Sequence, residues 1–443
     1  MWAWLRRFAQ KGYLALFVLL LSFHWKLENG NWKFFKNMSS ICLYFQAHQP
    51  IRIKKYRVFD VGQDHKYFND SSDTNLNNKK IIQKVAAKSY LPANELLLRL
   101  LGKYKEFKVS YSFSGVFLEQ LEEYLPELLV SFQKLVKTKR VEILSETYYH
   151  SLAFFYSRSE FESQVDLHKK KIKEVFGITP QVFRNTELAY TNELAQWADK
   201  KGYKAILAEG WDPILGWRSP NYVYKPTGTK KIKLLLKNYK LSDDVAFRFS
   251  EKSWSQWPLT ADKFAQWVNA INGNGQVVNL FMDYETFGEH QWAENGIFNF
   301  LESLPGELLK HPDNDFITPR EAAERYPAMD EIDVPYIVTW ADTERDLSAW
   351  MGNAIQSSAI KFIYDLEGEV LKTEDKDLIS DWRKLQISDH FYYMCTKWFA
   401  DGDVHKYFNP YESPYDAFIS FMNAANDLKL RVNQISIDKS KAN

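Results

Sequence analysis

The chain of 443 residues contains only two cysteines and almost no excess of charge. Cys42 and Cys395 cannot form a disulfide scaffold, and each lies in an apolar or aromatic run typical of a buried free thiol. The 57 lysines and arginines nearly balance the 56 aspartates and glutamates, which removes the electrostatic basis for binding nucleic acid or an anionic membrane. The cysteine content favours the reducing cytoplasm, and nucleic acid is not an expected partner.

Motifs for metal and nucleotide chemistry are also missing from the sequence. Its nine histidines include no pair at positions i and i+4, the spacing with which one helix offers two ligands to zinc. There is no Gly-x-x-x-x-Gly-Lys-Ser/Thr loop, and no Gly-x-Gly-x-x-Gly follows a predicted strand. We therefore predict neither a metal ion nor another cofactor.

One apolar run near the N-terminus has the length of a targeting segment. Residues 13–23 follow a basic segment and suit a signal-peptide core better than a membrane span, but no small-x-small cleavage site follows. Residues 1–37 are therefore a signal or anchor, an unprocessed interfacial helix, or an extension upstream of a start at Met38, which we favour. A membrane is an expected partner only if this segment is a genuine anchor.

The sequence does contain the composition of a folded globular protein with many aromatic side chains. Hydrophobic residues make up 45% and charged residues 26%, and the chain is too long for one compact core. Aromatic residues reach 16%, including 15 tryptophans and 25 tyrosines. Their apolar faces and polar tips suit sugar rings, although filling the core accounts for most of them.

Apolar runs of strand length alternate with helical patterns as far as about residue 300. Polar residues of catalytic types follow nearly every run. Such alternation predicts an α/β fold with a parallel sheet, and seven units favour a closed or nearly closed barrel over an open sheet. The predicted strands cover 41–45, 109–113, 141–144, 181–183, 205–208, 232–236 and 277–282.

The pattern changes after about residue 300, where helical stretches dominate. The only strand-like run in this part is 336–340. We therefore predict a catalytic barrel over residues 38–300 and an α-helical domain over residues 301–435 that completes the active-site cleft.

Carboxylates gather at the ends of two predicted strands. Asp283 closes the seventh strand and Glu187 follows the fourth. Parallel barrels place their chemistry at the C-terminal ends of strands, and retaining glycoside hydrolysis needs two carboxyl groups. Arg184 would keep Glu187 ionised. Crowding by Glu285 and Glu289 would raise the pKa of Asp283, as an acid requires. The alternative is that these carboxylates cap helices or pair with arginines.

Five separate segments of the chain resemble, in order and spacing, the five sequence regions of glycoside hydrolase family 57. The resemblance spans about residues 40–435 and is closest to the α-amylase-like members. It implies a distorted, TIM-like barrel of seven strands, (β/α)7, followed by a C-terminal α-helical domain. The matching segments are 48–50, 142–150, 184–187, 283–290 and 342–350.

The resemblance also implies an activity. By motif position, Glu187 matches the nucleophile and Asp283 the acid/base of enzymes that act on α-glucans with retention of configuration. Hydrolysis of α-1,4-glucans is therefore predicted, with a glucan or maltooligosaccharide as the expected partner. A 4-α-glucanotransferase would use the same intermediate with a sugar acceptor. A glucan-binding protein without catalysis is the alternative from a different class.

Several residues of the first two regions are expected to bind substrate. His48 matches a substrate-binding histidine, with a buried core histidine as the alternative. Glu142 matches an acidic residue near the first sugar, although Glu146 competes for that role. Tyr148 and His150 of the same region complete this group.

The later regions supply further candidates. Glu285 is expected to tune or orient Asp283, and His290 stands where other members carry an aromatic residue. Asp346 and Trp350 would bring a hydrogen-bonding carboxylate and a stacking ring from the helical domain onto the glucan.

Two more candidates lie outside the five regions. Trp211, on the loop after the fifth strand, is expected to stack on a sugar, with packing against the barrel as an even alternative. Asp389 is expected to face the cleft, with a helix cap at Ser388 as the alternative reading of that segment.

Overall fold

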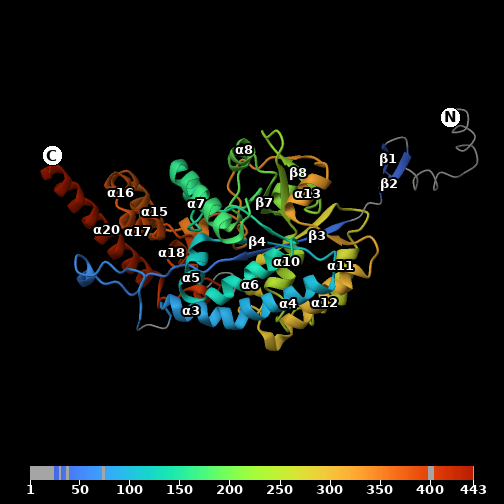
Figure 1. Ribbon diagram of the computed structural model, residues 1–443, viewed down its shortest axis with the longest axis horizontal. Coiled ribbons are helices and arrows are strands. Elements are labelled where there is room, and N and C mark those ends of the chain that lie inside the picture. Colours follow the sequence, from blue (N-terminus) through green and yellow to red (C-terminus); the bar gives the residue numbers. More distant parts are fainter. Residues whose placement is uncertain (1–23, 29–30, 36–38, 72–74, 398–403, 443) are drawn as a thin grey trace, which may run out of the picture.

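A computed structural model describes most of the chain (Figure 1). The described residues are 24–28, 31–35, 39–71, 75–397 and 404–442. The apolar run proposed as a targeting segment, and the favoured start at Met38, lie outside them. Within the described part of the N-terminal extension, β1 (His24–Glu28) pairs antiparallel with β2 (Asn31–Phe35). Among the described residues, no helix is both long and apolar enough to cross a membrane.

The first of two main sheets is parallel throughout. Its strand order is β10-β3-β4-β5, and the short β11 pairs with β3 beyond this path. The register aligns Asp283, the last residue of β10, with Gln46 near the end of β3. The carboxyl ends of the strands therefore meet along one edge. The strands are β3 (Ser40–Ala47), β4 (Val109–Phe113), β5 (Val141–Ile143), β10 (Val277–Asp283) and β11 (Asp315–Phe316).

The second sheet has the order β12-β8-β9-β7-β6. Strands β6, β7 and β9 run parallel, whereas β8 joins antiparallel to β9. Strands β8 and β12 were not expected from the sequence, because they are too short to give a pattern of alternation. The strands are β6 (Val182–Phe183), β7 (Ala205–Glu209), β8 (Val223–Pro226), β9 (Lys233–Lys237) and β12 (Glu331–Ile332).

The two sheets touch at both sides without forming one continuous barrel. On one side a single parallel bridge joins Ser145 to Phe183. On the other, the Asn238 backbone N–H donates to the Asn279 carbonyl at 2.9 Å, and the Asn279 side chain donates to the Leu236 carbonyl at 2.9 Å. Of the predicted closed or nearly closed barrel, the described strands therefore show two abutting sheets and no closed ladder. The reason is length: β5 and β6 have three and two residues, too few to extend a ladder between them.

Alternating side chains of β3 explain why both faces of the first sheet are covered. Ile41 and Leu43 belong to a large core that the outer helices share. Cys42 and Tyr44 point the other way, into a core that also collects residues of β7 and β9. Cys42 and Cys395 are both buried free thiols, as predicted.

Helices cover the outer faces of the sheets. Figure 1 shows α4, α6 and α12 along one side, where α4 packs against both of the others. Residues 115–137 form two helices and not one, because Pro126 begins a new helix after Leu125. The helices are α3 (Asn78–Val85), α4 (Leu91–Lys103), α5 (Gly115–Tyr124), α6 (Pro126–Lys137), α7 (Arg158–Phe176), α8 (Asn192–Lys200), α9 (Asp212–Leu215), α10 (Tyr239–Ala246), α11 (Ala261–Asn269), α12 (Ile297–Leu309) and α13 (Pro319–Arg325).

The C-terminal helices gather at one end of the molecule, coloured orange to red in Figure 1. They share a core of their own, which also includes Ile53, Tyr56 and Tyr67 from the loop after β3. Helical dominance begins later than residue 300, because β11 and β12 still pair with the two sheets. The strand expected over 336–340 is only an isolated bridge from Val338 to Tyr190. The helices are α14 (Ser348–Met351), α15 (Ala354–Asp365), α16 (Glu367–Thr373), α17 (Lys376–Lys384), α18 (Ser388–Tyr392), α19 (Val404–Phe408) and α20 (Pro414–Ala442).

Candidate active site

A cavity of about 280 Å³ opens at the carboxyl ends of the strands. It is lined from both sheets and from α18 and α19 of the C-terminal helices. Eight of the twelve predicted site residues line it: His48, His150, Glu187, Asp283, Glu285, His290, Trp350 and Asp389. Residues from strand ends and from helices that are far apart in the sequence therefore meet at one place.

Glu187 lies on the 3₁₀ turn η4 (Thr186–Leu188), directly after β6. Its backbone has φ = 57°, and Leu188 follows with φ = 50°, a left-handed conformation that costs a residue with a Cβ about 1–3 kcal/mol. The turn directs the carboxylate into the cavity, where Oε1 contacts His150 Nε2 at 3.2 Å. Oε2 accepts a hydrogen bond from the Trp340 indole N–H at 2.8 Å. Each carboxylate oxygen thus has its own partner.

A chain of alternating charges leads to Glu187 from the fully buried Glu146. Glu146 Oε2 lies 3.1 Å from His150 Nδ1 and 3.6 Å from Arg184 Nη1. Burial by itself would raise the pKa of Glu146, but the bond to His150 and the charge of Arg184 lower it to about 2. Burial would likewise lower the pKa of His150, but its bonds to Glu146 and Glu187 raise it to about 9. At neutral pH a histidinium therefore lies between two carboxylates.

The two predicted catalytic carboxyl groups have opposite pKa shifts. Burial would raise the pKa of Glu187, but the hydrogen bond and charge of His150, together with the charge of Arg184, lower it. Burial and the charge of Glu187 raise the pKa of Asp283 to about 6, although Arg184, His150 and Lys237 act against this. One group is therefore held ionised while the other binds a proton near neutrality, the pattern of a nucleophile beside an acid.

Glu285 is buried and lies close enough to Asp283 to respond to its charge. Its Oε1 accepts hydrogen bonds from the Tyr90 hydroxyl and from the His48 backbone N–H, the latter at 3.3 Å. Burial, then the charge of Asp283, raise its pKa to about 8. Glu285 is therefore protonated at neutral pH and anchors the loop after β3.

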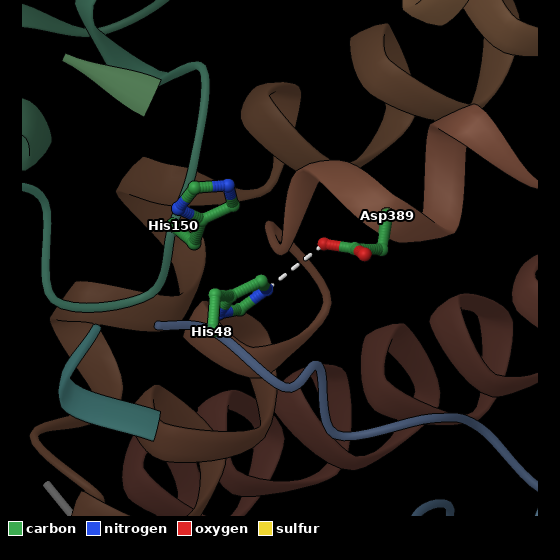
Figure 2. A group of neighbouring side chains, drawn as sticks. All are labelled: His48, His150 and Asp389. Atoms are coloured by element: carbon green, nitrogen blue, oxygen red, sulfur yellow. Dashed lines mark hydrogen bonds and ion pairs between the residues drawn. The ribbon is translucent and has the colours of Figure 1, made fainter. Parts of the chain in front are cut away.

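His48, His150 and Asp389 form a compact group whose ligating atoms lie within 4.8 Å of one another (Figure 2). His48 Nε2 contacts Asp389 Oδ2 at 3.0 Å, and its Nδ1 contacts the Ser114 hydroxyl at 2.6 Å. The two imidazole rings stack with centroids 4.0 Å apart. Burial and the neighbouring His150 charge lower the pKa of His48, so a neutral ring lies on a cationic one. A metal ion could bind here only by displacing these contacts and the His150 protons.

Four predicted site residues lie away from the cavity. Glu142 accepts from the Arg320 backbone N–H at 2.9 Å and lines a second cavity, of about 270 Å³. Glu142 lies within β5, whereas Glu146, which competed with it for the role beside the first sugar, lies beyond the carboxyl end of that strand. Tyr148 is buried and its hydroxyl donates to Glu119 Oε1 at 2.7 Å.

Trp211 and Asp346 have structural contacts instead of cavity contacts. Trp211 packs against the core of the second sheet, which is the alternative considered for it. The Asp346 carboxylate accepts from the Ser348 backbone N–H at 2.8 Å. Asp342 of the same segment lines the cavity, with its carboxylate 3.0 Å from His405 Nε2. Of the two aspartates in this segment, Asp342 and not Asp346 therefore lines the cavity.

Two other candidates line the cavity in settings that the sequence did not indicate. Trp350 is only 2% exposed, so its ring is mostly covered by neighbours such as Tyr392, 5.9 Å away between centroids. His290 meets the Phe408 ring edge-on at 5.3 Å, and burial lowers its pKa to about 4. His290 is therefore neutral and placed beside an aromatic ring near the cavity wall.

The cavity-lining residues that sequence reasoning missed include Trp340, which donates to Glu187, and Lys237. Trp340 was assigned to a strand, and no local pattern relates it to Glu187. Lys237 ends β9, so the rule that strand ends carry function could have identified it.

Comparisons with known proteins agree with this geometry. The family model described as "Glycosyl hydrolase family 57" matches residues 42–335. A Methanocaldococcus jannaschii protein named "Putative alpha-amylase" is 43% identical over 408 residues, covering 89% of this chain and 85% of that protein.

Solved structures share the fold at low identity. A GH57-type branching enzyme from Pyrococcus horikoshii is similar with a TM-score of 0.62 and 16% identity, over 84% of this chain and 87% of that one. A 4-alpha-glucanotransferase from Thermococcus litoralis gives 0.58 and 16%, over 80% of this chain, which spans only 56% of that enzyme. From the family match and the 43% identical relative together, the chain belongs to glycosyl hydrolase family 57.

Proposed function

We propose that the protein is a retaining glycoside hydrolase that acts on α-1,4-glucans. The observation that carries this proposal is the pairing of Glu187, whose pKa is lowered, with Asp283, whose pKa is raised to about 6, in one cavity. The membership of glycosyl hydrolase family 57 and the 43% identity to a protein named for alpha-amylase support the substrate class.

The reaction proceeds in two displacements at the anomeric carbon. In the first, Glu187 attacks this carbon while Asp283 gives its proton to the glycosidic oxygen, and the C–O bond breaks with its electron pair on the leaving sugar. In the second, Asp283 takes a proton from water as the water oxygen attacks the same carbon, and Glu187 leaves as a carboxylate. Two inversions give net retention, and the enzyme returns to its starting charge state.

The remaining cavity residues bind and orient the sugar in this proposal. His48, held between Ser114 and Asp389, presents a fixed neutral ring. His150 keeps a positive charge beside the nucleophile. The seven strands β3, β4, β5, β6, β7, β9 and β10 are proposed to be a distorted (β/α)7 barrel whose cleft the C-terminal helical domain completes. Asp389 and Tyr392, both from the C-terminal helices, line the cavity, which supports a cleft shared between the strands and the helical domain.

The second candidate is 4-α-glucanotransfer, in which a sugar hydroxyl replaces water in the second displacement. The similarity of the fold to that of a 4-alpha-glucanotransferase supports this second candidate. Both activities share the glycosyl-enzyme intermediate, and the balance between them depends on how well the cavity excludes water.

Incubation with a maltooligosaccharide of defined length tests the proposal. Hydrolysis gives only shorter chains, and ¹H NMR in the first minutes should show the new reducing end in the α configuration. Longer chains or rings would favour transfer. A product released first as the β anomer, or no product at all, would contradict the proposal.

A further inference from the structure

Trp340 makes the second contact to the carboxylate of Glu187. Its indole N–H donates to Oε2 at 2.8 Å, while His150 engages Oε1 at 3.2 Å. Trp340 also lines the cavity. With one partner on each oxygen, the plane of the carboxylate is fixed about its own bond axis, which neither contact alone could achieve.

The segment that carries Trp340 is paired with the segment that carries Glu187. The Tyr190 backbone N–H donates to the Val338 carbonyl at 2.8 Å, and the Val338 N–H donates back at 3.1 Å. The Trp340 N–H then donates to the Glu187 carbonyl at 3.3 Å. Backbone hydrogen bonds, as well as the side-chain bond, therefore hold the ring of Trp340 next to the carboxylate of Glu187.

Two buried cations lie over the indole ring of Trp340. The Arg184 guanidinium carbon is 5.2 Å and the Lys237 ammonium 5.6 Å from the ring. Cations over the face of a tryptophan are attracted by its electron density, which restricts tilting of the ring. The charge of Arg184 also lowers the pKa of Glu187, which favours its ionised form.

A buried charge network fixes the backbone next to Trp340. The Lys237 ammonium lies 2.8 Å from Asp243 and 3.4 Å from Glu209. Arg345 bridges the same two carboxylates at 3.2 and 3.3 Å and donates to the Trp340 carbonyl. The ring is thus tied to the ends of β7 and β9 and to α10.

We propose that Trp340 is a positioning residue that holds the carboxylate of Glu187 ionised and oriented for attack on the anomeric carbon. The proposal rests on the proposed function of this same cavity. It differs from a packing role in one respect: the N–H group, not the ring volume, is what the reaction requires.

Trp340→Phe is the first test, because phenylalanine keeps an aromatic ring and removes the donor. The expected result is a fall in kcat of about 10- to 100-fold, the usual effect of losing a hydrogen bond to a charged group, with little change in KM. The acid limb of the pH profile should move to higher pH, since a carboxylate without its donor binds a proton more readily.

Trp382→Phe is the matched control. The Trp382 indole N–H donates to the Ile363 carbonyl at 2.7 Å inside the C-terminal helical core, away from the cavity. This variant loses a buried indole hydrogen bond of similar length, so it should lose stability while its kcat and acid limb stay those of the wild type.

Replacement of Trp340 by 3-benzothienylalanine keeps the test decisive if Trp340→Phe does not fold. This analogue preserves the shape of indole and substitutes sulfur for the N–H. The same fall in kcat and shift of the acid limb are expected. Wild-type kcat and an unmoved limb in a folded variant at position 340 would overturn the positioning role. An inactive wild type would instead overturn the proposed function.

Discussion

The strands have a cavity at each end, and Glu142 and Glu146, four residues apart, lie towards opposite ends. Glu142 lines the cavity at the amino ends, where burial raises its pKa to about 7. Glu146 is fully buried near the cavity at the carboxyl ends, and His150 and Arg184 overcome the effect of its burial to give a pKa of about 2. Burial acts in the same direction on both, so the difference comes from the cations placed beside Glu146.

The comparison teaches that charged partners decide whether a buried carboxyl group is ionised at neutral pH, because burial alone favours its protonated form. At the amino ends, Glu142 has a backbone N–H and no cation in direct contact among the interactions of the described residues. At the carboxyl ends, cations and carboxylates alternate through His150 to Glu187. Catalysis should therefore depend on one end only, and the following variants test that asymmetry.

Glu187→Gln should give the largest effect. Removing the nucleophile should reduce maltooligosaccharide cleavage by at least about a thousand-fold, because no covalent intermediate can form. Glu142→Gln is the matched control and should change the rate less than about twofold, since its side chain lies at the opposite end of the strands. Comparable losses in the two variants would remove the distinction between the cavities.

Glu146→Gln should follow, with a loss of about 100-fold. Without the carboxylate at its Nδ1, His150 becomes less basic, and Glu187 then loses part of the positive charge that keeps it ionised. Rates measured across pH should show the acid limb displaced upward. A Glu146→Gln enzyme that matches Glu142→Gln in rate and pH profile would show that the charge chain has no catalytic role.

The pH profile should show which carboxyl group acts as the acid. Asp283 must be protonated to donate, so kcat/KM should fall about tenfold per pH unit above its pKa of about 6. The acid limb should lie below the ordinary range of a glutamate, because the pKa of Glu187 is lowered. Glu142 titrates near this range as well, so Glu142→Gln must retain the basic limb. Loss of the basic limb in Glu142→Gln would mean that this limb reports Glu142, at the amino ends of the strands, and not Asp283.

The smallest effect concerns stability. A carboxyl group with a raised pKa binds its proton more tightly in the folded state, so Glu142 costs stability as the pH rises from its ordinary pKa towards 7. Glu142→Gln should therefore raise the free energy of unfolding by about 1 kcal/mol at pH 8 and leave it unchanged near pH 4. Urea unfolding at both pH values measures this. A variant less stable than the wild type at pH 8 would mean that the bond from Arg320 outweighs the cost of the charge.

The sequence predicted well what depends on local pattern. Seven strands were expected near their observed positions, and the strand-end rule identified Glu187 and Asp283 as residues of one cavity. The resemblance placed Glu142 near the first sugar, but its side chain lines the cavity at the amino ends of the strands. Prediction also failed where pairing is too short to leave a pattern, as at the edges of the two sheets.

What could not be predicted is contact between distant segments. Trp340 and Glu187 are 153 positions apart, and no sequence pattern near either residue indicates the hydrogen bond between them. The charges of Arg345, Lys237 and Asp243 likewise become a network only in the folded chain. Such pairs carry no periodicity, so a single sequence cannot reveal them.

The bond between His48 and Asp389 joins residues 341 positions apart. During synthesis, a ribosome must therefore release almost the whole protein before this part of the cavity can close. The sheets can form earlier, but a nascent chain that ends before α18 has no partner for the His48 ring and an open wall where Asp389 and Tyr392 belong. The cavity is thus completed late, at the end of translation, and a protein truncated before α18 is expected to fold in part yet bind no sugar.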